Sequence, residues 1–335
     1  MTAITRNNCL SKPLCLMSRF YAALRGAAIA LLLAVSGPVT AQPAATGAEL
    51  CVLVPHFKDE YWISVGFGLE AEARRRHLSL SLHEAGGYRA LDRQIAQLDA
   101  CAADDSAAVL IGAVSRDDPA LLAAVARAAR VKPVWGLVNA LDSPDLAGRV
   151  GVDWRQMGAA VGDYLRARHP SGGPQVTAVL ISGPVQAGWT PLVEGGLRAA
   201  LRNSAVRLAW VFSADTGLRQ QMVQVEAALS LDPAPDYIIG SAPAIEAAMG
   251  LLRGRAGPQP VLIATYVSHS MRRGLQNGQV AALPFDDPVR QGEMAVARAS
   301  GAVGADDPPL AVRLVGQGDA AGLRLSPAGY MPPIR

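Results

Sequence analysis

The chain has 335 residues, half of them hydrophobic, and a formal net charge of +3 at pH 7. Of its 31 basic residues, four lie in the first 41 positions, which hold no acid, so the rest of the chain carries 27 basic against 28 acidic residues. The chain beyond residue 41 therefore lacks the basic field expected of a nucleic-acid-binding protein.

The N-terminal segment has the pattern of a secretory signal peptide. A basic stretch is followed by the apolar run GAAIALLLAVSG and by small residues at Val39 and Ala41. A basic region, a short apolar core and a small-residue exit predict a signal peptide over residues 1–41, cleaved after Ala41. An uncleaved anchor is the less favoured alternative, because a membrane span needs about 20 apolar residues. We therefore expect an exported chain that starts at Gln42.

Two cysteines remain after cleavage, Cys51 and Cys101. Cys51 lies at the start of the first predicted strand, and Cys101 lies at the end of a predicted helix. In an exported protein such a pair could form one disulfide. The sequence leaves this open, since two small buried thiols fit equally well.

Strand-like and helix-like segments alternate along the rest of the chain. Ten apolar runs predict strands at 49–56, 78–86, 107–114, 133–140, 149–153, 177–184, 207–215, 236–242, 261–267 and 280–285. Amphipathic stretches predict helices at 69–77, 91–103, 119–129, 155–169, 193–203 and 220–230. This alternation indicates βαβ units with buried parallel strands. The length suits two domains of about 150 residues, each with a sheet of five or six strands and with a crossover near 150–153.

Seven aromatic residues follow or end predicted strands, in both halves of the chain. They are Tyr61, Trp62, Tyr88, Trp154, Trp189, Tyr266 and Phe285. Ligands of open parallel sheets bind beyond the carboxyl ends of the strands. The pattern therefore predicts an aromatic-lined cleft between two lobes, although loop packing explains any single member equally well. We expect Trp135, Trp210, Phe212 and Tyr237 to pack in the core.

Aromatic faces attract cations, with about 2 kcal/mol for a desolvated contact. They also stack on sugar rings, so a sugar is the competing ligand. Sugar sites usually carry many polar groups, whereas the polar candidates here are only Asp59, Asp153 and Ser241. This balance favours a methylated ammonium ligand.

Several strings are similar to those of one known family. They are PHFKDEYWISVGFG, HEAGGYRALDRQIAQLDAC, LIGAVS, GVDWRQMG, LISGPVQAGWT, YIIGSAPAIEAA and TYVSHSMRRGL. From about Glu49 to about Arg298 the chain resembles the TorT family, periplasmic proteins of the trimethylamine N-oxide (TMAO) respiratory system. The sequence departs from the family pattern mainly beyond about Gly301.

The resemblance implies an α/β fold of two Rossmann-like lobes with parallel sheets joined by three crossovers, the type I periplasmic binding protein fold. It places residues 48–153 plus 269–308 in the N-terminal lobe and residues 154–268 plus 309–330 in the C-terminal lobe. It also implies a periplasmic location.

The resemblance further implies a receptor that binds TMAO, or a similar methylated amine, and signals to the periplasmic domain of a TorS-like sensor histidine kinase. The implied aromatic box is Trp62, Tyr88 and Trp154. The hydroxyl of Tyr266 would bond the N-oxide oxygen, and Tyr61 and Asp59 would be wall or support residues. Because an acid near the oxide would repel it, we expect carboxylates on the methyl side or behind the box.

Other functional classes are less favoured. The histidines form no HExxH metal pair, no GxSxG elbow surrounds a serine, and no dinucleotide fingerprint is present. We therefore expect neither catalysis, nor a metal, nor a cofactor. A transcriptional repressor is disfavoured by the signal peptide. The main alternative is the substrate-binding protein of an ABC transporter for a sugar or a methylated amine, which would have the same cleft.

Overall fold

A computed structural model describes residues 47–301 and 310–334, which belong to one compact unit, Gln42–Arg335. The predicted signal peptide, with its cleavage site after Ala41, lies outside the described residues. None of the described helices is long and apolar enough to cross a membrane.

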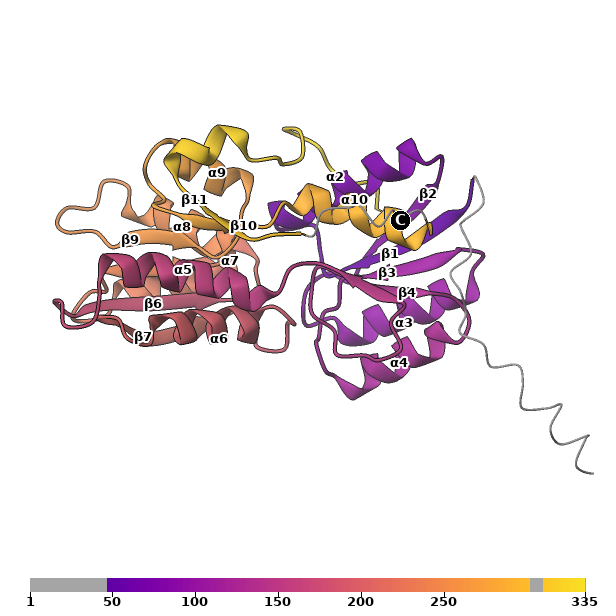
Figure 1. Cartoon of the computed structure of the whole chain (residues 1–335), viewed down its shortest axis with the longest axis horizontal. Coiled ribbons are helices and arrows are strands. Elements are labelled where there is room, and N and C mark those ends of the chain that lie inside the picture. The colour runs from indigo at the N-terminus through magenta and orange to yellow at the C-terminus, as the bar shows by residue number, and fades with distance from the viewer. Residues whose placement is uncertain (1–46, 302–309, 335) are drawn as a thin grey trace, which may run out of the picture. The chain divides into compact units, whose positions relative to one another are not determined.

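The first lobe is built on a sheet of five parallel strands in the order β2-β1-β3-β4-β5 (Figure 1). The strands are β1 (Glu49–Val54), β2 (Ser79–Glu84), β3 (Ala108–Ile111), β4 (Val134–Leu137) and β5 (Gly148–Val150). Helices α2 (Glu60–Arg75) and α10 (Pro288–Ala299) cover one face, and α3 (Leu91–Ala103) and α4 (Pro119–Ala129) cover the other. Each central strand is apolar on both faces because both faces are covered.

The second lobe has a sheet of four parallel strands in the order β7-β6-β8-β9. The strands are β6 (Val176–Ser182), β7 (Val206–Ser213), β8 (Tyr237–Gly240) and β9 (Val261–Ala264). The helices of this lobe are α5 (Trp154–Arg168), α6 (Thr190–Leu201), α7 (Leu218–Leu229), α8 (Ala242–Leu252) and α9 (His269–Gln276). The sheet core on the α5 and α6 side includes Leu165, Leu180 and Leu197.

All ten runs that predict strands contain a strand, and the α/β class with parallel sheets is confirmed. The expected size of the second sheet is wrong by at least one strand. The last run forms β10 (Leu283–Phe285), which pairs antiparallel with β11 (Arg313–Val315) instead of joining the four strands as a full member. A single bridge between Ile263 and Ala282 links this ribbon to β9.

The chain passes between the lobes at Gly151–Asp153, after β5, and at Asp286–Asp287, after β10. The passage from α10 to β11 includes residues 302–309, outside the described ranges. A further return was not expected from the sequence. After the short 3-10 helix η1 (Gln317–Gly322), Ser326 and Tyr330 bond Ser64 and Glu70 of α2 in the first lobe.

The contacts of α9 and of the tail suggest a revision of the lobe boundaries. Helix α9 packs against α8 and η1, whereas α10 packs against α2. We therefore propose that the second crossover follows β10 rather than preceding His269, and that the tail from Leu323 belongs to the first lobe.

The structure joins Cys51 of β1 to Cys101 of α3 in a disulfide, with their Cα atoms 6.0 Å apart. Both cysteines lie in the core between the first sheet and the helices α3 and α4. Of the two alternatives left open by the sequence, the structure therefore has the bridged pair.

Candidate functional site between the two lobes

Six aromatic side chains meet where the carboxyl ends of the two sheets face each other, and we call them the aromatic cluster. They are Tyr61, Trp62, Tyr88, Trp154, Trp189 and Tyr266, each only 3% exposed. Tyr61 and Trp62 lie in the first turn of α2, Trp154 begins α5 and Trp189 directly precedes α6. Tyr88 and Tyr266 lie in the loops after β2 and β9. The parallel topology brings these segments together because each one follows the end of a strand.

The rings touch one another across the two lobes. The ring centroid of Tyr61 lies 6.3 Å from that of Trp62, 6.2 Å from that of Trp154 and 5.5 Å from that of Tyr266. The rings of Trp154 and Tyr266 both contact Trp189, at 5.6 and 5.7 Å. Most of these pairs are edge-to-face, the arrangement that aromatic quadrupoles prefer. Five of the six rings therefore form one continuous aromatic wall with members from both lobes, and Tyr88 joins it through a hydrogen bond to Trp189.

Hydrogen bonds fix the orientation of the polar edges. The indole N–H of Trp154 donates to the carbonyl of Val138 at 3.0 Å. The hydroxyl of Tyr88 accepts from the indole of Trp189 at 3.1 Å and from the side-chain amide of Asn139 at 3.3 Å. Burial raises the pKa of Tyr88 to about 12, so its hydroxyl keeps its proton at neutral pH.

Asp59 connects the cluster to the start of α2. Its Oδ1 accepts from the backbone N–H of Tyr61 as the helix cap, and its Oδ2 accepts from the hydroxyl of Tyr266 at 2.5 Å. Burial raises the pKa of Asp59 to about 6, although the hydrogen bonds from Tyr266 and Tyr61 lower it. A carboxylate at this depth lacks solvation, and a nearby positive charge would compensate for that loss.

A second buried acid, Asp286, lies directly after β10 and was not predicted from the sequence. Its Oδ2 accepts from the hydroxyl of Tyr61 at 2.7 Å and from the amide of Gln291 at 2.8 Å. Burial raises the pKa of Asp286 to about 6. Its Oδ1 and the Oε1 of Gln291 are buried acceptors without a partner among the described residues. The two acids give the aromatic cluster a negative electrostatic character.

Two glycines allow the indoles to lie this deep. A Cβ at Gly112, just after β3, would lie 2.4 Å from Cη2 of Trp62. A Cβ at Gly183, just after β6, would lie 2.2 Å from Cζ2 of Trp189. Real Cβ atoms do not approach so closely, so any larger residue would displace the ring. These strand-end glycines therefore shape the site.

Hydrogen bonds outside the cluster also join the lobes. Nε2 of His56, after β1, lies 2.9 Å from the hydroxyl of Thr216, which precedes α7. The carboxylate of Glu60 accepts from the backbone N–H of Ser270 at 2.9 Å and from its hydroxyl at 3.2 Å. Burial lowers the pKa of His56 to about 4, so its ring is neutral at pH 7. These contacts hold the lobes together around the cluster.

The structure brings together all six residues selected from the sequence, Trp62, Tyr88, Trp154, Tyr266, Tyr61 and Asp59. Trp189, another of the seven strand-end aromatics, lies beside them. Three weaker candidates have other partners. Phe285 lies in β10 beneath the guanidinium of Arg313, 5.0 Å from the ring centre. Asp153 is exposed and caps α5. Ser241 caps α8 and donates to Gln221.

Sequence reasoning missed Asp286, Gln291 and Asn139. A signal existed for the first of these, because Asp286 directly follows Phe285 at the end of an apolar run, as Asp153 follows Val152. Nothing in the sequence marks Gln291, which reaches the site from the first turn of α10.

Among the aromatic residues expected in the core, Trp210 is 36% exposed, so that expectation is wrong for this residue.

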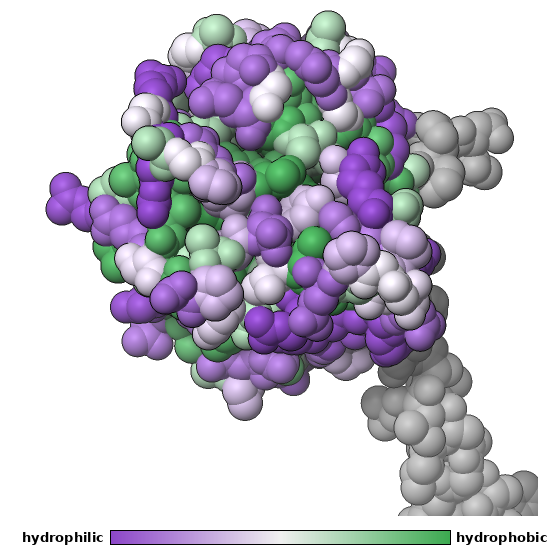
Figure 2. Space-filling view, turned by 90° about the vertical axis from the view of Figure 1, so that its left-hand side faces the viewer, coloured by the Kyte–Doolittle hydropathy of each residue, from purple (hydrophilic) through white to green (hydrophobic). Residues whose placement is uncertain are grey.

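Two cavities away from the cluster are less suited to a methylated ligand. One of about 430 Å³ lies beside β9 and the end of α8, and one of about 440 Å³ lies between α8 and α9. Among the described residues that line these two cavities, none is aromatic. Figure 2 shows this end of the molecule, where hydrophobic residues gather between hydrophilic ones.

The sequence matches one protein family over most of its length. The family described as periplasmic binding protein domain matches residues 50–306. The periplasmic protein TorT of Escherichia coli, in strains O157:H7 and K12, is 37% identical over 292 residues. The match covers 85% of this chain and 83% of TorT.

Solved structures agree with these relatives. One is the complex of the TorS sensor domain and TorT in the presence of TMAO. Its TorT chain is 32% identical to this chain, with a TM-score of 0.75. The match covers 86% of this chain and 100% of that chain. An ABC transporter solute binding protein from Bradyrhizobium sp. BTAi1 with bound bis-tris is 34% identical, with a TM-score of 0.71. That match covers 90% of this chain and 95% of the other.

Proposed function

The chain belongs to the TorT family of periplasmic binding proteins, and from this premise we propose that it is a periplasmic receptor for TMAO. In this proposal TMAO binds in the aromatic cluster, and the liganded receptor signals to the periplasmic domain of a TorS-like sensor histidine kinase. The single observation that carries the proposal is the arrangement of six buried aromatic residues and two buried acids, Asp59 and Asp286, contributed by both lobes.

The chemistry of TMAO suits this arrangement. Its nitrogen carries three methyl groups and a formal positive charge, which aromatic faces bind through their negative quadrupole. The buried carboxylate of Asp286, which has an acceptor oxygen without a partner among the described residues, favours the same positive charge. A methylated nitrogen offers no hydrogen-bond donor, so the indoles of Trp62 and Trp154 match it better than a polar pocket would.

The N-oxide oxygen requires a donor, and the hydroxyl of Tyr266 is the best placed one. This hydroxyl bonds Asp59 in the structure, so the N-oxide would compete with the carboxylate for one proton. If the oxide takes the bond, Asp59 loses a stabilising donor and its pKa rises further. Asp59 would then gain a proton, and the repulsion between carboxylate and oxide would disappear.

Signalling follows from the position of the cluster. Because both lobes supply rings, TMAO contacts favour one arrangement of the lobes over others. A ligand shifts such an equilibrium only by its differential affinity for the two states. We propose that the kinase domain binds one lobe arrangement more tightly than the other. In this view the protein is a receptor and not an enzyme.

Transport is the second candidate, and a specific observation favours it. The solute binding protein with bound bis-tris is as similar to this chain as TorT in the complex is. Bis-tris is a substituted amine, so an ABC transporter receptor for a methylated amine would use the same aromatic site. The ligand site alone does not distinguish the two functions, but the partner does.

Calorimetric titration of the mature chain, from Gln42, tests the ligand. TMAO would be compared with glycine betaine, choline and ribose. Saturable binding of TMAO alone supports the proposal, whereas binding of betaine or ribose alone overturns it and favours transport. Binding of a TorS-like sensor domain, measured with and without TMAO, tests the partner. An affinity unchanged by TMAO would contradict the signalling role.

A further inference from the structure

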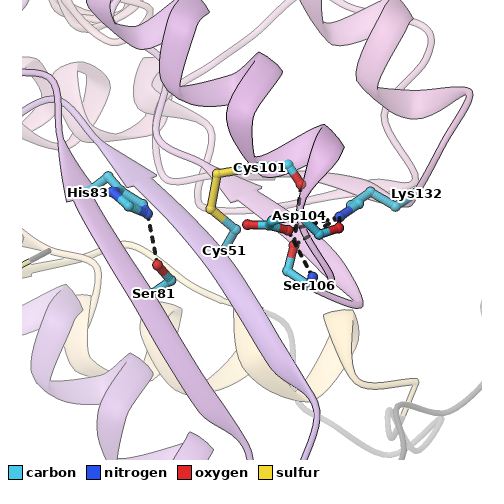
Figure 3. The surroundings of a disulfide bond; sticks show 7 residues. All are labelled: Cys51, Ser81, His83, Cys101, Asp104, Ser106 and Lys132. Carbon is cyan, nitrogen blue, oxygen red and sulfur yellow. Dashed lines mark hydrogen bonds and ion pairs between the residues drawn. A yellow bond between two sulfur atoms is a disulfide. The ribbon is translucent and has the colours of Figure 1, made fainter.

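A second cluster of reactive side chains lies in the first lobe, and the proposed receptor function does not use it. Among the described residues, Cys51, His83 and Cys101 place one sulfur or ring-nitrogen atom each within 4.8 Å of the other two. Figure 3 shows His83 beside the disulfide on the β2 side, with the end of α3 on the opposite side. The cysteines are 0% and 1% exposed, and His83 is half-buried.

Sheet register places His83 on the same side as the disulfide. Cys51 pairs with Ser81 in the parallel register of β1 and β2, and Leu53 pairs with His83. Side chains of residues two apart on a strand share one face. Ser81 also orients the imidazole, since its hydroxyl lies 2.8 Å from Nε2 of His83.

The backbone holds these residues in place without help from the disulfide. Cys51 lies in β1, which is paired on both sides, to β2 and β3. The turn after Cys101 is tied by the buried ammonium of Lys132, which donates to the carbonyl of Asp104 at 2.8 Å and to the hydroxyl of Ser106 at 3.2 Å. The three side chains would therefore remain neighbours if the disulfide were reduced.

We propose that, in the reduced protein, Cys51, Cys101 and His83 form a binding site for a soft metal ion of the Zn²⁺ type. Two thiolates and one imidazole are a ligand set that Zn²⁺ prefers, with metal–ligand bonds of about 2.0–2.3 Å and a fourth position for water. After reduction the two sulfur atoms are no longer bonded and would move apart, so that each of them and the imidazole of His83 could bond one metal ion between them. The lobe would then be cross-linked between β1, β2 and α3 by the metal in place of the disulfide.

Reduction of the Cys51–Cys101 disulfide requires two electrons, which a dithiol can supply. Thiol–disulfide exchange transfers two electrons and two protons to the Cys51–Cys101 bond, and the dithiol leaves as its own disulfide. Metal binding then replaces the two thiol protons with two sulfur–metal bonds and releases the protons to water. The ring nitrogen of His83 supplies the third bond without a redox change.

The test uses the mature chain, reduced without oxygen by a phosphine, which leaves no competing thiol. Co²⁺ is titrated as the spectroscopic probe, and Zn²⁺ is then added to displace it. We expect one Co²⁺ per chain, with thiolate charge-transfer bands and tetrahedral visible bands. The same bands are absent from the oxidised protein, because its sulfurs are bonded to each other. Far-ultraviolet circular dichroism reports whether the reduced chain keeps its fold.

Two matched histidine variants distinguish Co²⁺ binding at the proposed site from Co²⁺ binding elsewhere on the protein. His83→Asn removes the third ligand and is expected to weaken Co²⁺ binding tenfold or more, since even outer-shell changes cost 10–100-fold. His77→Asn is the control, because His77 is an exposed histidine in the turn after α2 and is not one of the three clustered residues. The proposal is wrong if the reduced chain shows no thiolate bands, if it loses its fold, or if both variants bind Co²⁺ equally.

Discussion

The hydroxyl of Tyr266 donates a hydrogen bond of 2.5 Å to the carboxylate of Asp59, and this bond joins a loop of the second lobe to the first turn of α2. Both residues are buried. A hydrogen bond to a charged acceptor contributes about 1.5–3 kcal/mol. The bond therefore links closure of the two lobes to the protonation of one acid.

Removal of this hydroxyl is expected to weaken TMAO binding. In Tyr266→Phe the ring stays in the aromatic cluster, but the donor for the N-oxide oxygen is lost. We expect the dissociation constant, measured by calorimetry, to rise about tenfold or more. Tyr237→Phe is the matched control, because the hydroxyl of Tyr237 lies 2.8 Å from Nε2 of His169 within the second lobe. Equal affinities for the two variants would rule out a role of Tyr266 as donor.

TMAO binding is expected to take up a proton near pH 6.5. The pKa of Asp59, about 6 in the structure, rises when the N-oxide takes the bond from Tyr266. The complex then binds more protons than the free protein, so the affinity increases as the pH falls from 8 towards 6. Calorimetry at one pH in buffers of different ionisation enthalpy measures this uptake.

Asp59→Asn is the control for the proton uptake, since an amide does not titrate. Its proton uptake should be close to zero, and its affinity should depend little on pH over the same range. Asp286 also has a raised pKa of about 6, so Asp286→Asn shows whether the second acid contributes. An uptake that persists unchanged in Asp59→Asn would contradict the proposed exchange of the Tyr266 proton.

The sequence was sufficient for the strands and for the aromatic members of the site, for a simple reason. Parallel strands end at a common edge, so aromatic residues after separate strands, such as Tyr88 and Tyr266, meet without any knowledge of distances. The residues that hydrogen-bond the hydroxyl and indole groups of these aromatic side chains could not be predicted in this way. Gln291 reaches Tyr61 only because α10 returns to the first lobe and packs on α2. The hydrophobic periodicity of a helix predicts which of its faces is buried, but it does not show which polar residue contacts another helix.

Strand pairing at the edge of the second sheet and the contacts of the tail could not be predicted from local sequence patterns either. The run at 280–285 has the composition of a buried strand, but its pairing is set by residues more than 25 positions later in β11. Likewise, the return of Tyr330 to Glu70 joins positions 260 residues apart. Local patterns predict elements, whereas these contacts depend on the whole tertiary arrangement.

Removal of the buried indole of Trp154 is expected to weaken TMAO binding more than removal of the partly exposed indole of Trp210. Trp154→Leu keeps an apolar side chain but removes the aromatic face, which contributes about 2 kcal/mol to a desolvated cation. We expect the dissociation constant for TMAO to rise roughly 30-fold. Trp210→Leu is the control on β7, where the indole is 36% exposed, and should leave binding unchanged. If both variants bound TMAO as the wild type does, the aromatic cluster would not be the ligand site.

The depth of Trp62 in the site is expected to depend on Gly112. In Gly112→Ala the new methyl group would lie 2.4 Å from Cη2 of Trp62, and the indole, 3% exposed, has neighbours on every side. Overpacking of this kind typically costs about 1–3 kcal/mol. We therefore expect a lower unfolding midpoint in urea together with weaker TMAO binding.

Gly195→Ala, on the exposed side of α6, makes the same chemical change at a place where no atom of the described residues lies within 4 Å of the added Cβ. Alanine in a helix is more favourable than glycine by about 0.5–1 kcal/mol. This control should therefore be slightly more stable than the wild type and bind TMAO equally well. If Gly112→Ala lost stability but kept full affinity, the position of Trp62 would matter for folding and not for the ligand. The comparison of the two alanine variants thus separates the packing role of the indole from its role in recognition.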